Sequence, residues 1–129
     1  MLGKIDISRL NTPPEKHEFE TAKFFASREK DITFLRPSSI PNIHRPDILM
    51  DGLEWEIKCP EGGSKRTIES NIRKAVTQSH YIIIDLRWIK VPEKQCLSQL
   101  ELHFKTKPAI KRLLIITKNL ELIEFPSKS

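Results

Sequence analysis

Residues 46–58 read PDILMDGLEWEIK and predict a β-hairpin at the centre of the chain. The Asp51-Gly52 dipeptide favours a tight turn, and the residues on both sides of it are mainly apolar or strand-forming. Glu56 and Lys58 are two residues apart on the second strand, so they project from the same face of the sheet. Asp47 comes just before the first strand. The hairpin therefore returns Asp47 to the end of the second strand that carries Glu56 and Lys58.

Two carboxylates beside an ammonium group are typical of a metal-dependent phosphodiesterase site. The oxygens of Asp47 and Glu56 suit Mg²⁺, which keeps several waters and completes its shell with phosphate oxygens. Mn²⁺ or Zn²⁺ could take the same place. Such a metal lowers the pKa of a bound water, and Lys58 could orient that water or neutralise the attacked phosphate. A purely structural alternative is that Glu and Lys keep an edge strand soluble.

The composition indicates one small basic domain. The chain has 129 residues, with 22 Lys and Arg against 17 Asp and Glu, which gives a net charge of +5. We expect an N-terminal arm or linker over residues 1–13 and a single nuclease-like domain over residues 14–126. An excess of basic over acidic residues favours a polyanionic partner such as nucleic acid, although many small basic proteins bind no such partner.

Three other features of the sequence concern the redox compartment, membrane insertion and export of the protein. Cys59 and Cys96 lack the spacing of a structural zinc site or of a disulfide framework, which favours a reduced compartment. The sequence contains no apolar run of membrane-spanning length. Residues 1–11 lack the apolar stretch of a secretory signal, so we expect a soluble chain that does not export itself.

A first helix is predicted from residue 14 to about residue 28, and it contributes a further acidic candidate. Its apolar stripe begins at Phe19 and continues at helical spacing. Glu18 lies at the edge of that stripe and should point toward the sheet, whereas Glu20 should point toward water. Glu18 is therefore a candidate third acidic residue of the metal site. The alternative is a glutamate that only complements the helix dipole.

A second helix is predicted over residues 64–78, with an apolar face and a polar stripe beside it. We expect the stripe to face a cleft. Its members are Ser64, Thr67, Asn71, Lys74 and Gln78. Ser64 and Thr67 could bind a phosphate at the helix N-terminus, although simple N-capping is the alternative. Lys65, Arg66, Arg73 and Lys74 suit contact with a phosphodiester backbone, although such residues often only form a solvated face.

The remaining elements complete the predicted fold class. Strands are expected over residues 31–35, 81–86, 112–117 and 121–125, with a helix over residues 93–105. The resulting order is helix, three strands, helix, strand, helix and two strands, which indicates an α/β fold with an α+β mixed sheet. We expect Trp55 to pack in the core and Asp85 to pair with Arg87. The four histidines are scattered, so a metal-free nuclease that uses histidine is only an alternative.

Several strings of the sequence, in the same order, resemble the C-terminal tRNase domain of contact-dependent growth inhibition toxins. They are HEFETA at 17–22, RPDI at 45–48, EWEIKCP at 54–60, GSKRTI at 63–68 with Asn71, and IIIDLR at 82–87. The resemblance spans about residues 15–125. It implies a restriction-endonuclease-like PD-(D/E)xK fold and a divalent-metal nuclease that cuts tRNA. It further implies a cognate immunity protein that covers the active site, and action in the cytoplasm after delivery as part of a larger exported protein.

The resemblance also implies roles for individual residues. Glu18, Asp47, Glu56 and Lys58 would be the metal and catalytic residues, while Ser64, Thr67, Asn71 and Gln78 would line the cleft. Our hypothesis is a Mg²⁺-dependent endonuclease that acts on RNA, with tRNA favoured over DNA. Asp47 and Glu56 would hold the metal, Glu18 would assist, and Lys65 and Lys74 would help to bind phosphates. A DNA endonuclease of the same fold and a non-catalytic nucleic-acid-binding module are the alternatives.

Overall fold

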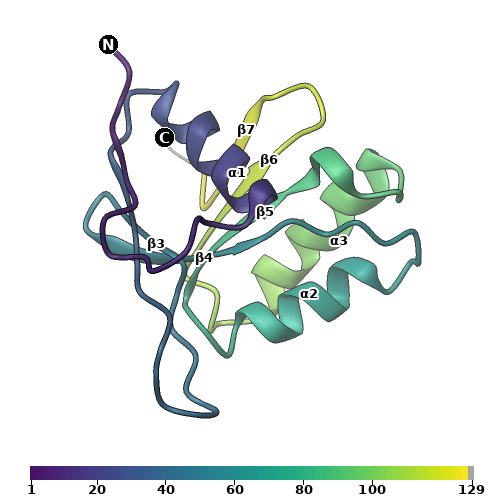
Figure 1. Ribbon diagram of the computed structural model, residues 1–129. Helices are drawn as coiled ribbons and strands as arrows, with labels where there is room; N and C mark the ends of the chain where they lie inside the picture. Colours follow the sequence, from purple (N-terminus) through teal and green to yellow (C-terminus); the bar gives the residue numbers. More distant parts are fainter. Residues whose placement is uncertain (128–129) are drawn as a thin grey trace.

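The computed structural model describes residues 1–127, which form one seven-stranded mixed sheet with helices on both faces (Figure 1). The strands are β1 (Ile5–Asp6), β2 (Ile32–Phe34), β3 (Ile48–Met50), β4 (Leu53–Lys58), β5 (Tyr81–Asp85), β6 (Arg112–Ile116) and β7 (Leu122–Phe125), and the helices are α1 (Lys16–Ala26), α2 (Thr67–Ala75), the 3₁₀ helix η1 (Leu86–Trp88) and α3 (Glu93–Thr106). The predicted mixed sheet is confirmed. In this part of the chain, no helix has both the length and the apolar composition needed to cross a membrane.

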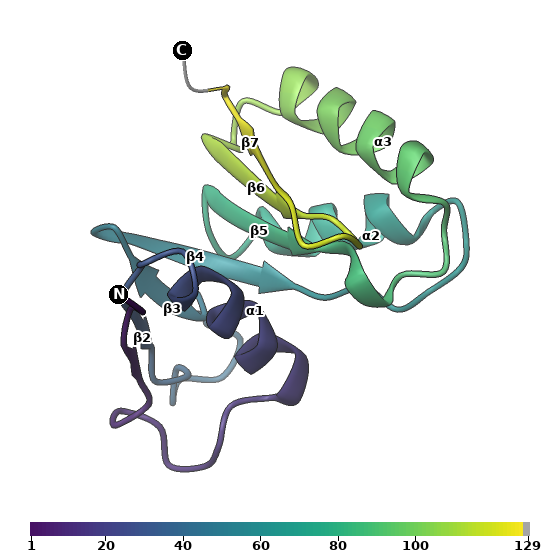
Figure 2. The same ribbon diagram turned by 90° about the horizontal axis from the view of Figure 1, so that it is seen from above.

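The strands follow one another across the sheet in chain order, from β1 to β7. Three neighbouring pairs are parallel, namely β1 with β2, β4 with β5, and β5 with β6. Each of these pairs is joined by a crossover that contains an α-helix, because parallel neighbours cannot be linked by a tight turn. Figure 2 shows α1 on one face of the sheet, and α2 with α3 on the other.

Two hydrophobic cores lie on the two faces of the sheet. Ile83 of β5 is buried on the α1 side together with Phe25 and Trp55. Its neighbours Ile82 and Ile84 are buried on the side of α2 and α3. A strand covered on both faces needs apolar residues at consecutive positions, which explains the uninterrupted apolar run at β5. The predicted core position of Trp55 is confirmed, since its side chain is fully buried.

The β3–β4 hairpin forms where it was predicted. Asp51 and Gly52 have φ angles of 54° and 76°, as a two-residue turn with positive φ at both central positions requires. Met50 pairs with Leu53, and Ile48 pairs with Trp55. This register places Asp47 opposite the Glu56 end of β4.

Helix α2 and strand β5 are both shorter than predicted. Helix α2 begins at Thr67 and ends at Ala75, so Ser64 and Gln78 lie in the flanking turns and not on the helix. The Ser64 hydroxyl accepts a hydrogen bond from the backbone N–H of Arg66 at 3.0 Å, which stabilises the first of these turns. Strand β5 ends at Asp85 because that side chain accepts the Arg87 N–H at 3.2 Å and starts η1.

The segment predicted as an N-terminal arm contains a strand that the sequence did not indicate. Ile5 and Asp6 form β1, which pairs with Ile32 and Thr33 of β2. The backbone N–H of Gly3 also donates to the carbonyl of Ala26 at the end of α1, at 2.8 Å. These contacts attach the first residues of the chain to the sheet.

Replacing Gly3 with alanine should loosen this attachment, because a Cβ at this position would overlap the backbone carbonyl of Lys30. We expect a loss of about 1–3 kcal/mol of stability, typical of overpacking, and faster proteolysis within the first ten residues. Thermal unfolding and limited proteolysis measure the two effects. Gly63→Ala is the matched control, since its Cβ would meet the Lys90 side chain at 3.4 Å, an ordinary contact distance. Equal behaviour of the two variants would contradict the prediction.

Candidate active site

The hairpin brings Asp47, Glu56 and Lys58 together as the sequence predicted. The backbone N–H of Asp47 donates to the carbonyl of Trp55 at 2.9 Å. One carboxylate oxygen of Asp47 accepts the backbone N–H of Ile57 at 2.8 Å, which fixes the side chain against β4. The Lys58 Nζ lies 3.2 Å from Oε2 of Glu56, and the Glu56 side chain is only 4% exposed. The ammonium group and the two carboxylates therefore form one compact, mostly buried cluster.

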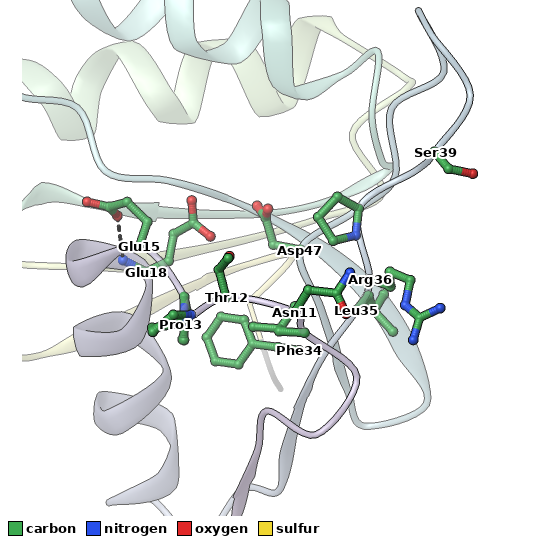
Figure 3. Close-up of a pocket in the computed structure, with 13 residues that line it drawn as sticks. Asn11, Thr12, Pro13, Glu15, Glu18, Phe34, Leu35, Arg36, Ser39 and Asp47 are labelled. Carbon is green, nitrogen blue, oxygen red and sulfur yellow. Dashed lines mark hydrogen bonds between the residues drawn. The ribbon is translucent and has the colours of Figure 1, made fainter.

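Glu18 reaches the same cluster from the first turn of α1. The side chain of Glu15 caps this helix by accepting the backbone N–H of Glu18 at 3.0 Å. This cap fixes the start of the helix one turn before the apolar residues that dock on the sheet. Glu18 and Asp47 line the same cavity, and Figure 3 shows their carboxylates next to each other. The structure thus brings together the four residues of the predicted catalytic set.

Burial and mutual repulsion make these carboxyl groups hard to ionise. Burial, together with the charge of Asp47, raises the pKa of Glu56 to about 8 from its ordinary value of 4.5. Burial and the charges of Asp47 and Glu15 raise the pKa of Glu18 to about 7. The pKa of Asp47 is also raised by burial, despite the opposing hydrogen bond from Ile57. The ionised form of each of these three carboxyl groups is destabilised. A bound cation would stabilise that form, so the site favours cation binding.

The donor set fits a hard divalent ion that keeps most of its water. No donor group among residues 1–127 meets the buried Oε1 of Glu56, and the Asp47 carboxyl lies within hydrogen-bonding reach of the Glu56 carboxyl. A buried carboxylate oxygen in this position is costly unless a proton, a cation or a water meets it. Among residues 1–127, no three acidic, histidine or cysteine side chains already converge as a complete ligand set. Two protein carboxylates plus water and phosphate oxygens match the usual coordination of Mg²⁺, whereas they do not match a four-ligand structural zinc site.

Two cavities open around the cluster, and they add residues that the sequence analysis missed. The larger has a volume of about 580 Å³ and includes Asn11, Thr12 and Arg36 among its lining residues. The smaller, of about 210 Å³, is lined in part by His17 and Lys58. Residues from the N-terminal segment and from the loop after β2 could not be assigned to the site from local patterns, because the pairing of β1 with β2 and of β2 with β3 brings them there.

The polar stripe predicted on the second helix lies apart from these cavities. Ser64, Thr67 and Asn71 line a separate, shallow hollow of about 280 Å³. The Asn71 amide donates to the backbone carbonyl of Thr67 at 2.8 Å, so part of its hydrogen-bonding capacity is used within α2. Lys65 and Lys74 are exposed to solvent, while Gln78 is half-buried beyond the helix end.

Asp85 has the structural role that the sequence predicted. It is fully buried, and its Oδ2 accepts from Nη2 of Arg87 at 2.7 Å. The hydroxyl of Thr21 on α1 donates to the same oxygen at 2.6 Å. This buried network ties α1 to β5, and therefore helps to hold Glu18 over the sheet.

The chain is similar to known proteins in both sequence and fold. Residues 44–122 match the sequence model of the family described as the contact-dependent growth inhibition CdiA C-terminal domain. The fold is similar to that of a chain in a CdiA-CT/CdiI toxin and immunity complex from Burkholderia pseudomallei, with a TM-score of 0.70 and 18% sequence identity over 95% of this chain and 98% of that one. A comparison with curated proteins gives no significant match.

Proposed function

Because the chain belongs to the family of contact-dependent growth inhibition CdiA C-terminal domains, and is therefore a toxin domain, we propose that its toxic activity is divalent-metal-dependent cleavage of RNA. tRNA is the favoured substrate. The observation that carries the proposal is the buried cluster of Asp47, Glu56 and Lys58 beside Glu18. All of these except Glu18 lie within residues 44–122, the part of the chain that matches the family.

The proposed fold assignment is a restriction-endonuclease-like PD-(D/E)xK core. The support for it is the β3–β4 hairpin that carries the Asp, Glu and Lys, followed by β5 in parallel beside β4. Helix α1 covers one face of these strands and presents Glu18 at their edge. This arrangement places acidic groups from two separate elements around one point of the sheet.

Each residue of the cluster has a distinct proposed role. Asp47 and Glu56 would hold Mg²⁺, and Mn²⁺ could replace it. The bound ion supplies a Lewis acid and a water of lowered pKa. Lys58 is held in place by its ion pair with Glu56, so its ammonium group can stabilise the negative charge that develops on the attacked phosphate. Glu18 has a pKa of about 7, which suits a group that accepts a proton from the attacking water near neutral pH.

The basic surface of α2 is the proposed contact for the RNA backbone. Lys65, Arg66 and Lys74 are exposed, and phosphate contacts of this kind position a nucleic acid without reading its sequence. Ser64, Thr67 and Asn71 would bind a phosphate farther from the cleavage point, in their own hollow. We place Gln78 with them as a polar group at the end of α2.

We further propose a cognate immunity protein that covers the cluster. The structurally similar chain comes from a toxin and immunity complex, which supports such a partner here. The family consists of C-terminal domains, so the domain would be delivered as part of a larger exported protein. Its proposed site of action is the cytoplasm, where tRNA is found.

Incubation of the purified domain with tRNA, total RNA and plasmid DNA tests the proposed function. We expect discrete tRNA fragments in the presence of Mg²⁺ and none after chelation of the metal with EDTA. Cleavage of plasmid but not of RNA would instead support a DNA endonuclease with the same site. Salt-dependent binding of RNA without cleavage in Mg²⁺ or Mn²⁺ would contradict catalysis and favour a binding module.

A further inference from the structure

We propose that the larger cavity receives the base of one unpaired nucleotide of the substrate, next to the phosphate that is cleaved. This inference rests on the proposed ribonuclease function. It adds that the nucleotide next to the cleaved bond is unpaired when the bond is cut. An unpaired base would have to be present in a loop, or be extruded from a helix, for cleavage to occur.

The lining of the cavity suits the two kinds of surface on a nucleobase. Phe34 is 2% exposed and forms an aromatic part of the wall, and the two prolines Pro13 and Pro14 add apolar surface. Asn11 and Thr12 supply an amide and a hydroxyl in the same cavity. A base has apolar faces and a polar edge, so an apolar wall with a few hydrogen-bonding groups can hold and orient it. The volume of about 580 Å³ is that of a typical small-ligand site.

The charges around the cavity favour a neutral base over a phosphate in its interior. Glu15, Glu18 and Asp47 line it, whereas Arg36 is the cationic residue among its lining side chains. A phosphate in the interior would meet more acidic than basic groups, whereas an uncharged base needs no cationic partner. Since Glu18 and Asp47 lie side by side in the cavity lining (Figure 3), a base inside the cavity would have its phosphate near the catalytic cluster.

The cavity is held open by contacts that do not depend on a ligand. One wall is the segment after β1, and pairing of β1 with β2 anchors that segment to the sheet. The backbone N–H of Leu10 donates to the carbonyl of Ile7 at 3.0 Å and fixes the turn that leads into the wall. The Nε of Arg36 donates to the carbonyl of Arg9 at 3.2 Å and links the two sides. A preformed pocket of this kind needs little reordering when a base enters.

Kinetics on matched oligonucleotides test the proposal once the cleaved bond in tRNA has been mapped. The substrate pair is an RNA hairpin that contains this bond and the same hairpin with an abasic ribose beside it. Removing the base on one side of the bond should lower kcat/KM by about tenfold, the usual effect of losing one bound base. Asn11→Ala should lower kcat/KM by about fivefold on the intact hairpin and have no effect on the abasic one. Asn119→Ala changes an exposed residue between β6 and β7, and should match the wild type on both.

The possible outcomes separate this inference from the proposed function. Equal cleavage of intact and abasic hairpins would overturn the base pocket and leave the nuclease function standing. Loss of activity by Asn11→Ala to the same extent on both substrates would also overturn it, because the amide would then not act through the base. If the wild-type domain cleaves no RNA in Mg²⁺, the proposed function itself fails, and the inference fails with it.

Discussion

Replacing Lys58 with alanine should lower kcat for RNA cleavage by about 10²–10³-fold, the usual effect of removing one preorganised group that stabilises transition-state charge. Lys58 is the cationic side chain in direct contact with the buried Glu56, at 3.2 Å. Lys58 lines the smaller cavity, so water can enter the space that the variant leaves, but water carries no positive charge to replace that of the ammonium group. The loss should appear in kcat and not mainly in KM, since the charge that Lys58 meets develops only during the reaction.

Single-turnover cleavage of tRNA, compared between the variant and the wild type at saturating protein, measures this effect. Lys105→Ala is the matched control, because Lys105 is an exposed lysine on α3 that pairs with Glu101 of its own helix. It should retain wild-type kcat. Thermal unfolding of both variants shows whether the fold is kept. A Lys58→Ala protein that is folded and cleaves tRNA at the wild-type rate would remove Lys58 from the site.

The β3–β4 hairpin could be predicted from the sequence because its determinants are local. Asp51 and Gly52 specify the turn, and the turn fixes the register that returns Asp47 to Glu56. The side of α1 that carries Glu18 could be predicted as well, since helical spacing relates Glu18 to the buried residues that follow it. Neither prediction needed any information about distant parts of the chain.

The walls of the larger cavity could not be predicted, because they depend on contacts between distant segments. Strand β1 has only two residues, Ile5 and Asp6, too few for a recognisable alternating pattern. Its pairing with β2 is what places Asn11 and Thr12 beside Asp47. The ends of α2 were missed for another reason. Ser64 and Gln78 continue the helical spacing, but turns replace the helix at both places.

Replacing Glu56 with glutamine should stabilise the metal-free protein at about pH 8 by on the order of 3 kcal/mol relative to the wild type, with no such difference at about pH 4. Burial raises the pKa of Glu56 from 4.5 to about 8, so the folded state keeps a proton that the unfolded state releases as the pH rises above 4.5. The wild type therefore loses stability between these two pH values, and the neutral amide of the variant does not titrate. Glu18 keeps its own raised pKa of about 7, so a smaller loss should remain in the variant.

Magnesium should reduce the difference in stability between the two proteins at pH 8. A bound cation favours the ionised carboxylate, so millimolar Mg²⁺ should raise the Tm of the wild type by several degrees and that of Glu56→Gln by much less. Thermal unfolding at several pH values, in EDTA and in Mg²⁺, measures all four conditions, and Glu101→Gln on the exposed face of α3 is the control. Two results would contradict the assignment. One is a variant no more stable than the wild type at pH 8 without metal, which would show that Glu56 ionises freely. The other is an equal response of both proteins to Mg²⁺, which would show that the ion binds without the Glu56 carboxylate.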